Sequence, residues 1–152
     1  MPVPPSAPRV DRGLAALALA LLPLLIGAAP ISRLDVGIDH IRSAKGLIRV
    51  CLTNDPDNFP SCVDDARAIT RSIPAGQHSL TLPGLPHGNY AVAVIHDENS
   101  NSKLDTFAGI PREGFGFSRN PAIAFGPPRF TAARFTLDSD AEAQQIRMRY
   151  IL

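Results

Sequence analysis

The side chains of residues 90–97, YAVAVIHD, follow a strict two-residue alternation. Because successive side chains of a strand point to opposite faces, this pattern predicts a β-strand. The apolar pattern ends after His96, so the strand is expected to lead into a polar loop. One face of the strand would carry Tyr90, Val92, Val94 and His96, and the other Ala91, Ala93, Ile95 and Asp97.

The loop that follows places side-chain oxygens at alternate positions. Asp97, Asn99, Asn101 and Asp105 occupy its first, third, fifth and ninth places, and Lys103 would add a backbone carbonyl at the seventh. Calcium loops present oxygen ligands at these offsets. The spacing therefore predicts a weak calcium site of the extracellular type, with a Kd on the order of 0.1 to 1 mM.

Two positions of this loop depart from a calcium loop. Ser102 holds the sixth place, where glycine permits the sharp turn, and Ala108 holds the twelfth, where a bidentate glutamate closes the shell. Glu98 or Glu113 would have to fold in, or water would fill the gap. The alternative interpretation is that Asp, Asn and Ser gather here because they hydrogen-bond the backbone of their own loop.

The N-terminal region has the features of a secretory signal peptide. Two arginines precede an apolar run, residues 14–29, which ends in small residues. This order predicts export, with cleavage near Ala29. An uncleaved anchor is the alternative, but a spanning helix needs about 18 or more apolar residues and this run is shorter and contains a proline. We assign residues 1–29 to the signal peptide and residues 30–152 to one domain, exported to the periplasm or the medium, with no membrane span after cleavage.

The chain has two cysteines, Cys51 and Cys62, both in the exported part. An oxidising compartment favours a disulfide between them. The bond would close a short loop rich in Asn, Asp and Pro, and would stabilise the fold by roughly 3 kcal/mol. A redox-active pair is the alternative, but it needs closer spacing and a helix N-terminus.

Composition excludes some classes of partner. Fifteen Lys and Arg residues against fourteen Asp and Glu leave the chain almost neutral. Nucleic-acid binding depends on counterion release by a basic surface, so this balance gives it no support. The four histidines include no pair at a helical or zinc-knuckle spacing, and transition-metal binding is not expected.

Short strand patterns recur along the exported part, each bounded by Gly, Pro, Asn or Asp. Several alternate apolar and polar residues, as strands of antiparallel sheets with one wet face do. The expected fold is all-β: a seven-stranded antiparallel Greek-key β-sandwich, transthyretin-like or immunoglobulin-like, with a long ordered loop before the last two strands. Only residues 61–70 could form a short helix. The predicted strands are residues 36–41, 47–53, 66–73, 78–82, 89–96, 131–137 and 145–151.

Residues 97–130, which we call the flap, lack a clear strand pattern but contain five of the seven phenylalanines. Disordered segments are poor in aromatic residues, so we expect an ordered flap whose phenylalanines seal one end or edge of the sandwich. Two interpretations are open: an aromatic platform for a sugar or peptide, or a lid that packs on its own core. The candidate binding residues of the flap are Phe107, Arg112, Glu113, Phe115, Phe117 and Phe125.

The turn, strand, loop and flap together resemble a bacterial exported family catalogued as domain-of-unknown-function family 2141. The resemblance is carried by LPHGNYAVAVIHDENSNSKLDTFAGIPREGFGFSRN and FGPPRF. Members are similar in outline to transthyretin-like and collagen-adhesin B-type sandwich modules, whose turn of Pro, Gly and Tyr is matched here by Pro86, Gly88 and Tyr90. The family loop commonly has glycine where this chain has Ser100 and Ser102. The family has no established activity, so the resemblance implies fold and export rather than a reaction.

Three classes of function follow. The first is a non-catalytic binding or structural module of the cell envelope, which contacts a macromolecule or a glycan through the flap or a sheet edge. The second is a calcium-stabilised structural domain. The third is a hydrolase in which His96 acts as general base, assisted by Asp97 or Glu113. No nucleophile motif such as G-x-S-x-G accompanies His96, so we expect no catalytic residue and no cofactor other than calcium.

Overall fold

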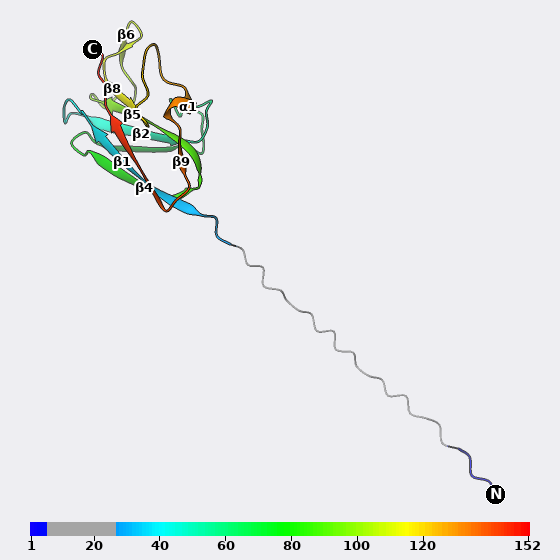
Figure 1. Cartoon of the computed structure of the whole chain (residues 1–152). Coiled ribbons are helices and arrows are strands. Elements are labelled where there is room, and N and C mark those ends of the chain that lie inside the picture. Colours follow the sequence, from blue (N-terminus) through cyan, green and yellow to red (C-terminus); the bar gives the residue numbers. More distant parts are fainter. Residues whose placement is uncertain (6–26) are drawn as a thin grey trace.

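The computed structural model describes residues 1–5 and 27–152. Eight of its ten strands form two facing sheets, and the short strand β6 (Thr106–Phe107) lies at the same end of the domain as the C-terminus (Figure 1). The three-stranded sheet has the order β10-β1-β4, formed by β1 (Ile31–Asp39), β4 (Ser79–Pro86) and β10 (Ala141–Arg147). The five-stranded sheet has the order β3-β2-β5-β8, formed by β2 (Leu47–Thr53), β3 (Ile69–Pro74), β5 (Gly88–Asp97) and β8 (Gly114–Phe117), and β9 (Phe135–Leu137) also pairs with β5. The hairpin of β6 (Thr106–Phe107) and β7 (Ile110–Pro111) and the short helix α1 (Phe130–Ala133) complete the described elements.

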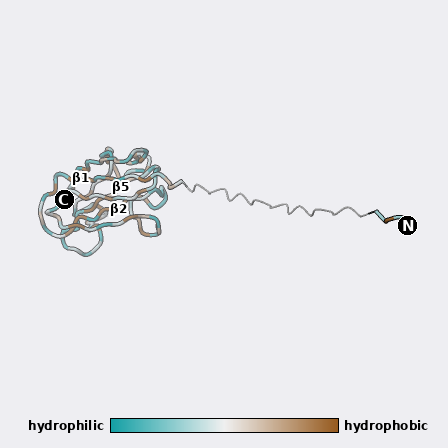
Figure 2. The backbone as a smooth tube through the Cα atoms, turned by 90° about the horizontal axis from the view of Figure 1, so that it is seen from below, coloured by the Kyte–Doolittle hydropathy of each residue, from teal (hydrophilic) through white to brown (hydrophobic). Residues whose placement is uncertain are grey.

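The main hydrophobic core lies between the two sheets. Val36 and Ile38 of β1 meet Val50 of β2 and Val92 and Val94 of β5, all almost fully buried. Hydrophobic residues accordingly concentrate along the central strands, and hydrophilic residues in the loops (Figure 2). The predicted alternation of β5 is confirmed, because Tyr90, Val92 and Val94 face this core.

A second apolar cluster covers the opposite face of β5. Ala91 and Ala93 of β5 pack there against aromatic residues from three separate segments. Strand β5 is therefore buried on both faces, whereas the sequence pattern predicted antiparallel sheets with one face exposed to solvent. The members of this cluster are Phe59, Ala91, Ala93, Phe115, Phe117, Phe130 and Ala133, with Ile123 packed against them.

The all-β prediction is confirmed, but its details need correction. The described residues form ten strands rather than seven, and β10 runs parallel to β1, so the arrangement is not wholly antiparallel. The strand predicted at residues 47–53 has the same bounds as β2. The segment predicted as a strand at residues 131–137 begins instead as helix α1, because Ala132 and Ala133 favour a helix and Ala133 is buried against the rest of the cluster.

Strand β10 also lies earlier than the predicted residues 145–151. Its inward-facing signal is weak, since Ile146 is its only fully buried side chain, and its position is set by parallel pairing with β1 from Arg33 to Asp39. The possible helix at residues 61–70 is wrong: turns occupy this segment until β3 begins at Ile69.

The predicted signal peptide, residues 1–29, falls largely on residues 6–26, which lie outside the described residues. Within the described part, no helix has the length and apolar character to cross a membrane. Strand β1 begins at Ile31, two residues after the predicted cleavage point, so cleavage there would leave every described strand intact.

Candidate functional site

Asp97 ends β5 with its side chain fully buried. Its Oδ2 accepts hydrogen bonds from Arg49 Nε at 2.6 Å and from the Ser102 amide at 2.8 Å, and its Oδ1 accepts one from the Asn101 amide at 3.0 Å. Burial by itself would raise the pKa of Asp97, but the bonds from Arg49 and the two amides outweigh it and lower the pKa. Asp97 therefore fastens the polar loop to β2 through Arg49.

The other predicted calcium ligands lie together on the exposed side of the loop. Asp105 accepts hydrogen bonds from Asn99 Nδ2 at 2.7 Å and from Asn101 Nδ2 at 2.9 Å. The amide oxygens accept backbone bonds, Asn99 Oδ1 from the Asn101 amide at 3.1 Å and Asn101 Oδ1 from the Lys103 amide at 2.9 Å. These are the bonds to the loop's own backbone that the alternative interpretation expected.

The calcium prediction concerns a set of oxygens that are now engaged in hydrogen bonds. Calcium at Asp105 would require the amides of Asn99 and Asn101 to turn their oxygens toward it, since nitrogen donors do not bind this ion. Among residues 1–5 and 27–152, no three His, Cys, Asp or Glu side chains gather in a metal-binding arrangement. The predicted set depends on asparagines and a carbonyl, so calcium binding stays a prediction.

Ser100 and Ser102 occupy unusual backbone positions. Both have positive φ values, 59° and 70°. Glycine adopts this left-handed region without a steric penalty, whereas other residues adopt it at a free-energy cost of roughly 1 to 2 kcal/mol. The glycines that the resemblance assigns to these places therefore have a physical reason, and serine adopts the same turns at a cost.

Glu113 holds the two ends of the loop together. It is 4 % exposed, its Oε1 accepts a hydrogen bond from the Glu98 amide at 2.9 Å, and its Oε2 accepts one from the Asp105 amide at 3.0 Å. Both carboxylate oxygens thus satisfy backbone donors of half-buried residues. Glu113, predicted as a binding residue of the flap, instead stabilises the loop through these hydrogen bonds. Arg112, predicted as a binding residue as well, is exposed.

His96 lies in the core and both of its ring nitrogens are hydrogen-bonded. Nε2 lies 2.8 Å from the Lys45 carbonyl oxygen, which can only accept, so Nε2 carries the proton. Nδ1 then accepts from Tyr150 Oη at 2.8 Å, and this hydroxyl accepts from the Arg42 amide at 3.1 Å. With 0 % exposure and no free nitrogen, His96 has no lone pair to offer a substrate.

Arg42 continues this network at the surface. Its Nη2 lies 2.5 Å from Glu98 Oε2, and its guanidinium lies 4.5 Å from the centre of the Tyr150 ring. The Arg42 hydrogen bond lowers the pKa of Glu98 to about 2. Asp97 and Glu98 therefore both bind arginines. The hydrolase hypothesis would require Asp97 or Glu113 to orient His96, but the ring nitrogens of His96 are hydrogen-bonded to Tyr150 and Lys45 instead.

The phenylalanines of the flap divide into two groups. Phe115 and Phe117 of β8 and Phe130 of α1 are buried, and the Phe117 ring packs edge-on against Phe59 at 5.8 Å. Phe107 and Phe125 are 68 % and 100 % exposed. The prediction of an ordered, packed flap therefore holds for Phe115, Phe117 and Phe130. The expectation that all five phenylalanines seal the sandwich is wrong, because the β6–β7 hairpin and the loop before α1 carry the other two outward.

The sequence GFGF of β8 explains how this strand fits. Its glycines face the C-terminal segment, where a Cβ on Gly114 would lie 2.4 Å from the Tyr150 ring and a Cβ on Gly116 would lie 2.7 Å from Ile146. The alternate positions place Phe115 and Phe117 on the outer face of the sheet beside Ile95 and Ala93 in register. β8 thus has glycines on one face and aromatic side chains on the other.

An apolar groove of about 590 Å³ lies on this outer face. Ala93, Ile95, Phe115 and Phe117 form its floor. Its sides come from loops far apart in the sequence: residues 60–61, the segment 102–111 with the β6–β7 hairpin, residues 123–127, and Ile151 near the C-terminus. Ligand pockets commonly have roughly 300 to 1,000 Å³, so the groove has the size of a binding site.

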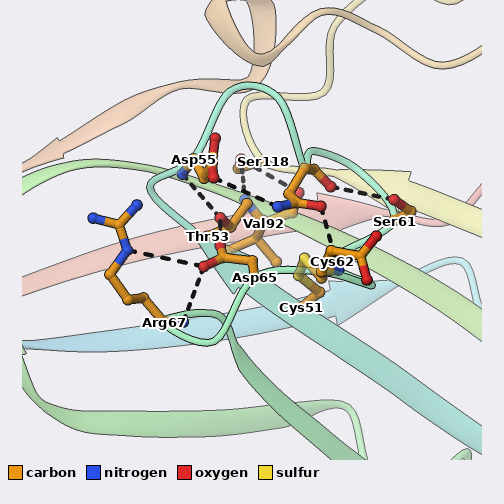
Figure 3. The surroundings of a disulfide bond; sticks show 11 residues. Cys51, Thr53, Asp55, Ser61, Cys62, Asp65, Arg67, Val92 and Ser118 are labelled. Atoms are coloured by element: carbon orange, nitrogen blue, oxygen red, sulfur yellow. Dashed lines mark hydrogen bonds and ion pairs between the residues drawn. A yellow bond between two sulfur atoms is a disulfide. The ribbon is translucent and has the colours of Figure 1, made fainter.

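The disulfide secures one side of the groove. Cys51 of β2 is bonded to Cys62, as predicted, with their Cα atoms 6.5 Å apart. Asp65 accepts a hydrogen bond from Thr53 Oγ1 at 2.5 Å, and the Asp55 amide donates to the same hydroxyl at 2.9 Å, so the loop is tied to the end of β2 (Figure 3). This loop supplies Phe59 to the aromatic cluster and residues 60–61 to the groove.

Comparison with known proteins adds a family to this geometry. The model of a bacterial family described as "Uncharacterized protein conserved in bacteria (DUF2141)" matches residues 36–145, more than half of the chain. The chain belongs to this family. No curated protein and no solved structure matches it significantly.

The match confirms the family resemblance found in the sequence, and it covers this DUF2141 protein from β1 into β10. The transthyretin-like outline stays a prediction. The turn that suggested it is well formed, since Tyr90 Oη donates a hydrogen bond to the Pro86 carbonyl at 3.0 Å.

Sequence reasoning missed several residues that build the site of this DUF2141 protein. Arg49 and Arg42 are remote in sequence from the carboxylates they bind, and Phe59 comes from a loop that carried no aromatic pattern. The alternation of Gly and Phe in β8 was the one local signal of a strand within the flap.

Proposed function

We propose that this protein is an exported, non-catalytic binding module of the bacterial cell envelope, and that it binds its ligand or partner in the apolar groove on the outer face of the five-stranded sheet. The proposal rests on one observation: a groove of about 590 Å³ with an apolar floor is open where loops of the flap surround it. Domains rarely leave such concave apolar surface uncovered unless it binds something.

Exposed aromatic residues on the loops of the groove support this location. Phe107 follows Thr106 of the groove wall, and Phe125 lies between Ala124 and Gly126 of the wall. Both rings are mostly or fully exposed, at 68 % and 100 %. Large apolar side chains are costly to expose, so their place beside an apolar groove favours a binding surface over a closed lid.

The state of the candidate catalytic groups supports a non-catalytic role. The ring nitrogens of His96, the carboxylate of Asp97 and the carboxylate of Glu113 are each occupied by bonds within the protein. A general base needs an accessible lone pair within reach of the substrate proton. The hydrolase alternative would require these bonds to break.

The disulfide and the N-terminal sequence support export. The predicted signal peptide precedes β1, and the Cys51–Cys62 bond suits an oxidising compartment. Fractionation of cells that express the full chain tests this part: the protein is expected in the envelope or medium with an N-terminus near Pro30.

Binding in the groove is tested with the apolar dye anilinonaphthalene sulfonate and folded protein. The dye is expected to bind with one site and increased fluorescence. The variant Ala124→Trp places a large ring at the groove wall and should abolish this signal, whereas Ala122→Trp changes an exposed residue of the same loop that does not line the groove. No dye binding, or equal loss in both variants, would count against a binding groove.

A further inference from the structure

The chemistry of the groove selects among classes of ligand. Its floor is formed by aliphatic and aromatic side chains, and few polar groups reach it. Three hydroxyl side chains line it, those of Ser61, Ser102 and Thr106. Ser61 donates to the Asn58 carbonyl, and Ser102 accepts from Arg49 Nη2 at 2.7 Å. A sugar would bury many hydroxyls there with few partners, at the cost of unsatisfied polar groups.

An extended peptide is also a poor match for the floor. The backbone of β5 already pairs with β2 on one side and β8 on the other, and Phe115 of β8 exchanges both backbone hydrogen bonds with Arg149. A peptide strand gains affinity by pairing with a free sheet edge, and the groove lies on a sheet face. The backbone amides of a bound peptide would find no free strand edge to hydrogen-bond with in the groove. A hydrocarbon chain has no polar groups that need such partners.

A single charge marks the wall of this apolar groove. Lys103 is the one charged side chain that lines it, it is exposed, and within residues 1–5 and 27–152 it forms no ion pair. Lys103 belongs to the polar loop, three residues before β6 begins at Thr106. A cation at the wall of an apolar groove is complementary to a ligand with an apolar body and an anionic head.

We propose that the groove binds a monomeric anionic amphiphile with one hydrocarbon chain, of which a fatty acid is the simplest case. The chain would lie on Ala93, Ile95, Phe115 and Phe117, and the carboxylate would meet Lys103. This inference rests on the proposed function, because it names the ligand class of the same groove. The volume of about 590 Å³ and the lack of competing acidic residues along the wall both suit this ligand.

The experiment measures displacement of anilinonaphthalene sulfonate by dodecanoate below its micelle concentration. The full chain is expressed with its own N-terminal segment and used in the form that the cells yield, so that differences between variants report the groove alone. Dodecanoate is expected to displace the dye with one site, and each methylene removed from the chain should weaken binding by about fourfold. Dodecyltrimethylammonium, with the same chain and a positive head, should bind more weakly.

The variants separate the chain from the head. Ala124→Trp should abolish dodecanoate binding and Ala122→Trp should leave it unchanged. Lys103→Met should weaken dodecanoate by about fivefold, as expected for an exposed charge pair, and leave dodecanol unaffected. Lys45→Met removes the other lysine of the chain, which does not line the groove, and is the charge-matched control. Circular dichroism melting of each variant verifies folding.

The outcomes distinguish the two proposals. Dye binding without dodecanoate binding, or equal affinity for the anionic and cationic amphiphiles, overturns the amphiphile inference and leaves the binding groove standing. Failure of both dye and dodecanoate to bind overturns both. Co-sedimentation with anionic lipid vesicles in the absence of dodecanoate binding also overturns the inference, because it assigns the exposed phenylalanines to a membrane surface.

Discussion

The ion pair of Arg49 and Asp97 allows a quantitative test of how the polar loop is held to the sheet. We predict that Arg49→Met destabilises the protein by about 3 kcal/mol at pH 7. Removal of one partner of a buried pair typically costs roughly 3 to 5 kcal/mol, because it leaves an unpaired buried charge. The lower end applies here, since Asp97 keeps its bonds from the Asn101 and Ser102 amides and the Arg49 side chain is 29 % exposed.

The pH dependence of this effect follows from the pKa of Asp97. Its folded pKa is lowered below the ordinary value of 3.8, so its contribution to stability is present above that value and is lost as pH falls toward the folded pKa. Without Arg49 the carboxylate binds a proton more readily. The destabilisation should therefore shrink to about 1 kcal/mol near pH 3, the size of a lost hydrogen bond between neutral groups.

Denaturant unfolding followed by circular dichroism at pH 7 and pH 3 measures both values. Arg71→Met is the control, because Arg71 is an exposed arginine of β3 that bonds only the Thr70 carbonyl, and its effect should stay within about 0.5 kcal/mol. Adding Asp97→Asn to Arg49→Met should recover part of the loss by removing the unpaired charge. A cost below about 1 kcal/mol at pH 7, or the same cost at both pH values, would refute this account of the pair.

Three further predictions concern the same face of the molecule. Ser100→Gly should stabilise the fold by about 0.5 to 1 kcal/mol, because Ser100 has a φ of 59°; a lower midpoint of denaturant unfolding would contradict this. Joint replacement of Cys51 and Cys62 by alanine should cost about 3 kcal/mol and weaken dye binding in the groove, since their loop forms one of its sides; unchanged dye affinity would separate the disulfide from the groove. If calcium binds the polar loop with the predicted affinity, 10 mM calcium should stabilise the protein by about 1.4 to 2.7 kcal/mol and Asp105→Asn should remove the effect; calorimetry without heat and an unshifted Tm would end the calcium hypothesis.

The sequence by itself determined the features that depend on neighbouring residues. The alternation of residues 90–97 predicted β5, residues 47–53 predicted β2, and the motif from the turn to the flap predicted the family. Two cysteines, together with the predicted signal peptide, predicted the bond that the structure contains. Local periodicity carries this information because successive side chains of a strand point to opposite faces, so every second side chain lies on the same face.

Only the tertiary structure decided which distant groups meet. Three interactions join residues that are separated by up to about a hundred positions: the parallel pairing of β10 with β1, the ion pair of Asp97 with Arg49, and the hydrogen bond of His96 with Tyr150. Partners so far apart in the chain produce no periodic pattern in the sequence.

The groove has the same origin. Phe115 and Phe117 acquired their outward face only because Gly114 and Gly116 allow the C-terminal segment to pack closely on the other side of β8. The side chains of the oxygen-rich loop hydrogen-bond its own backbone, and calcium binding there stays a prediction. The apolar groove beside it has a floor from β5 and β8 and sides from four further segments that only folding brings together.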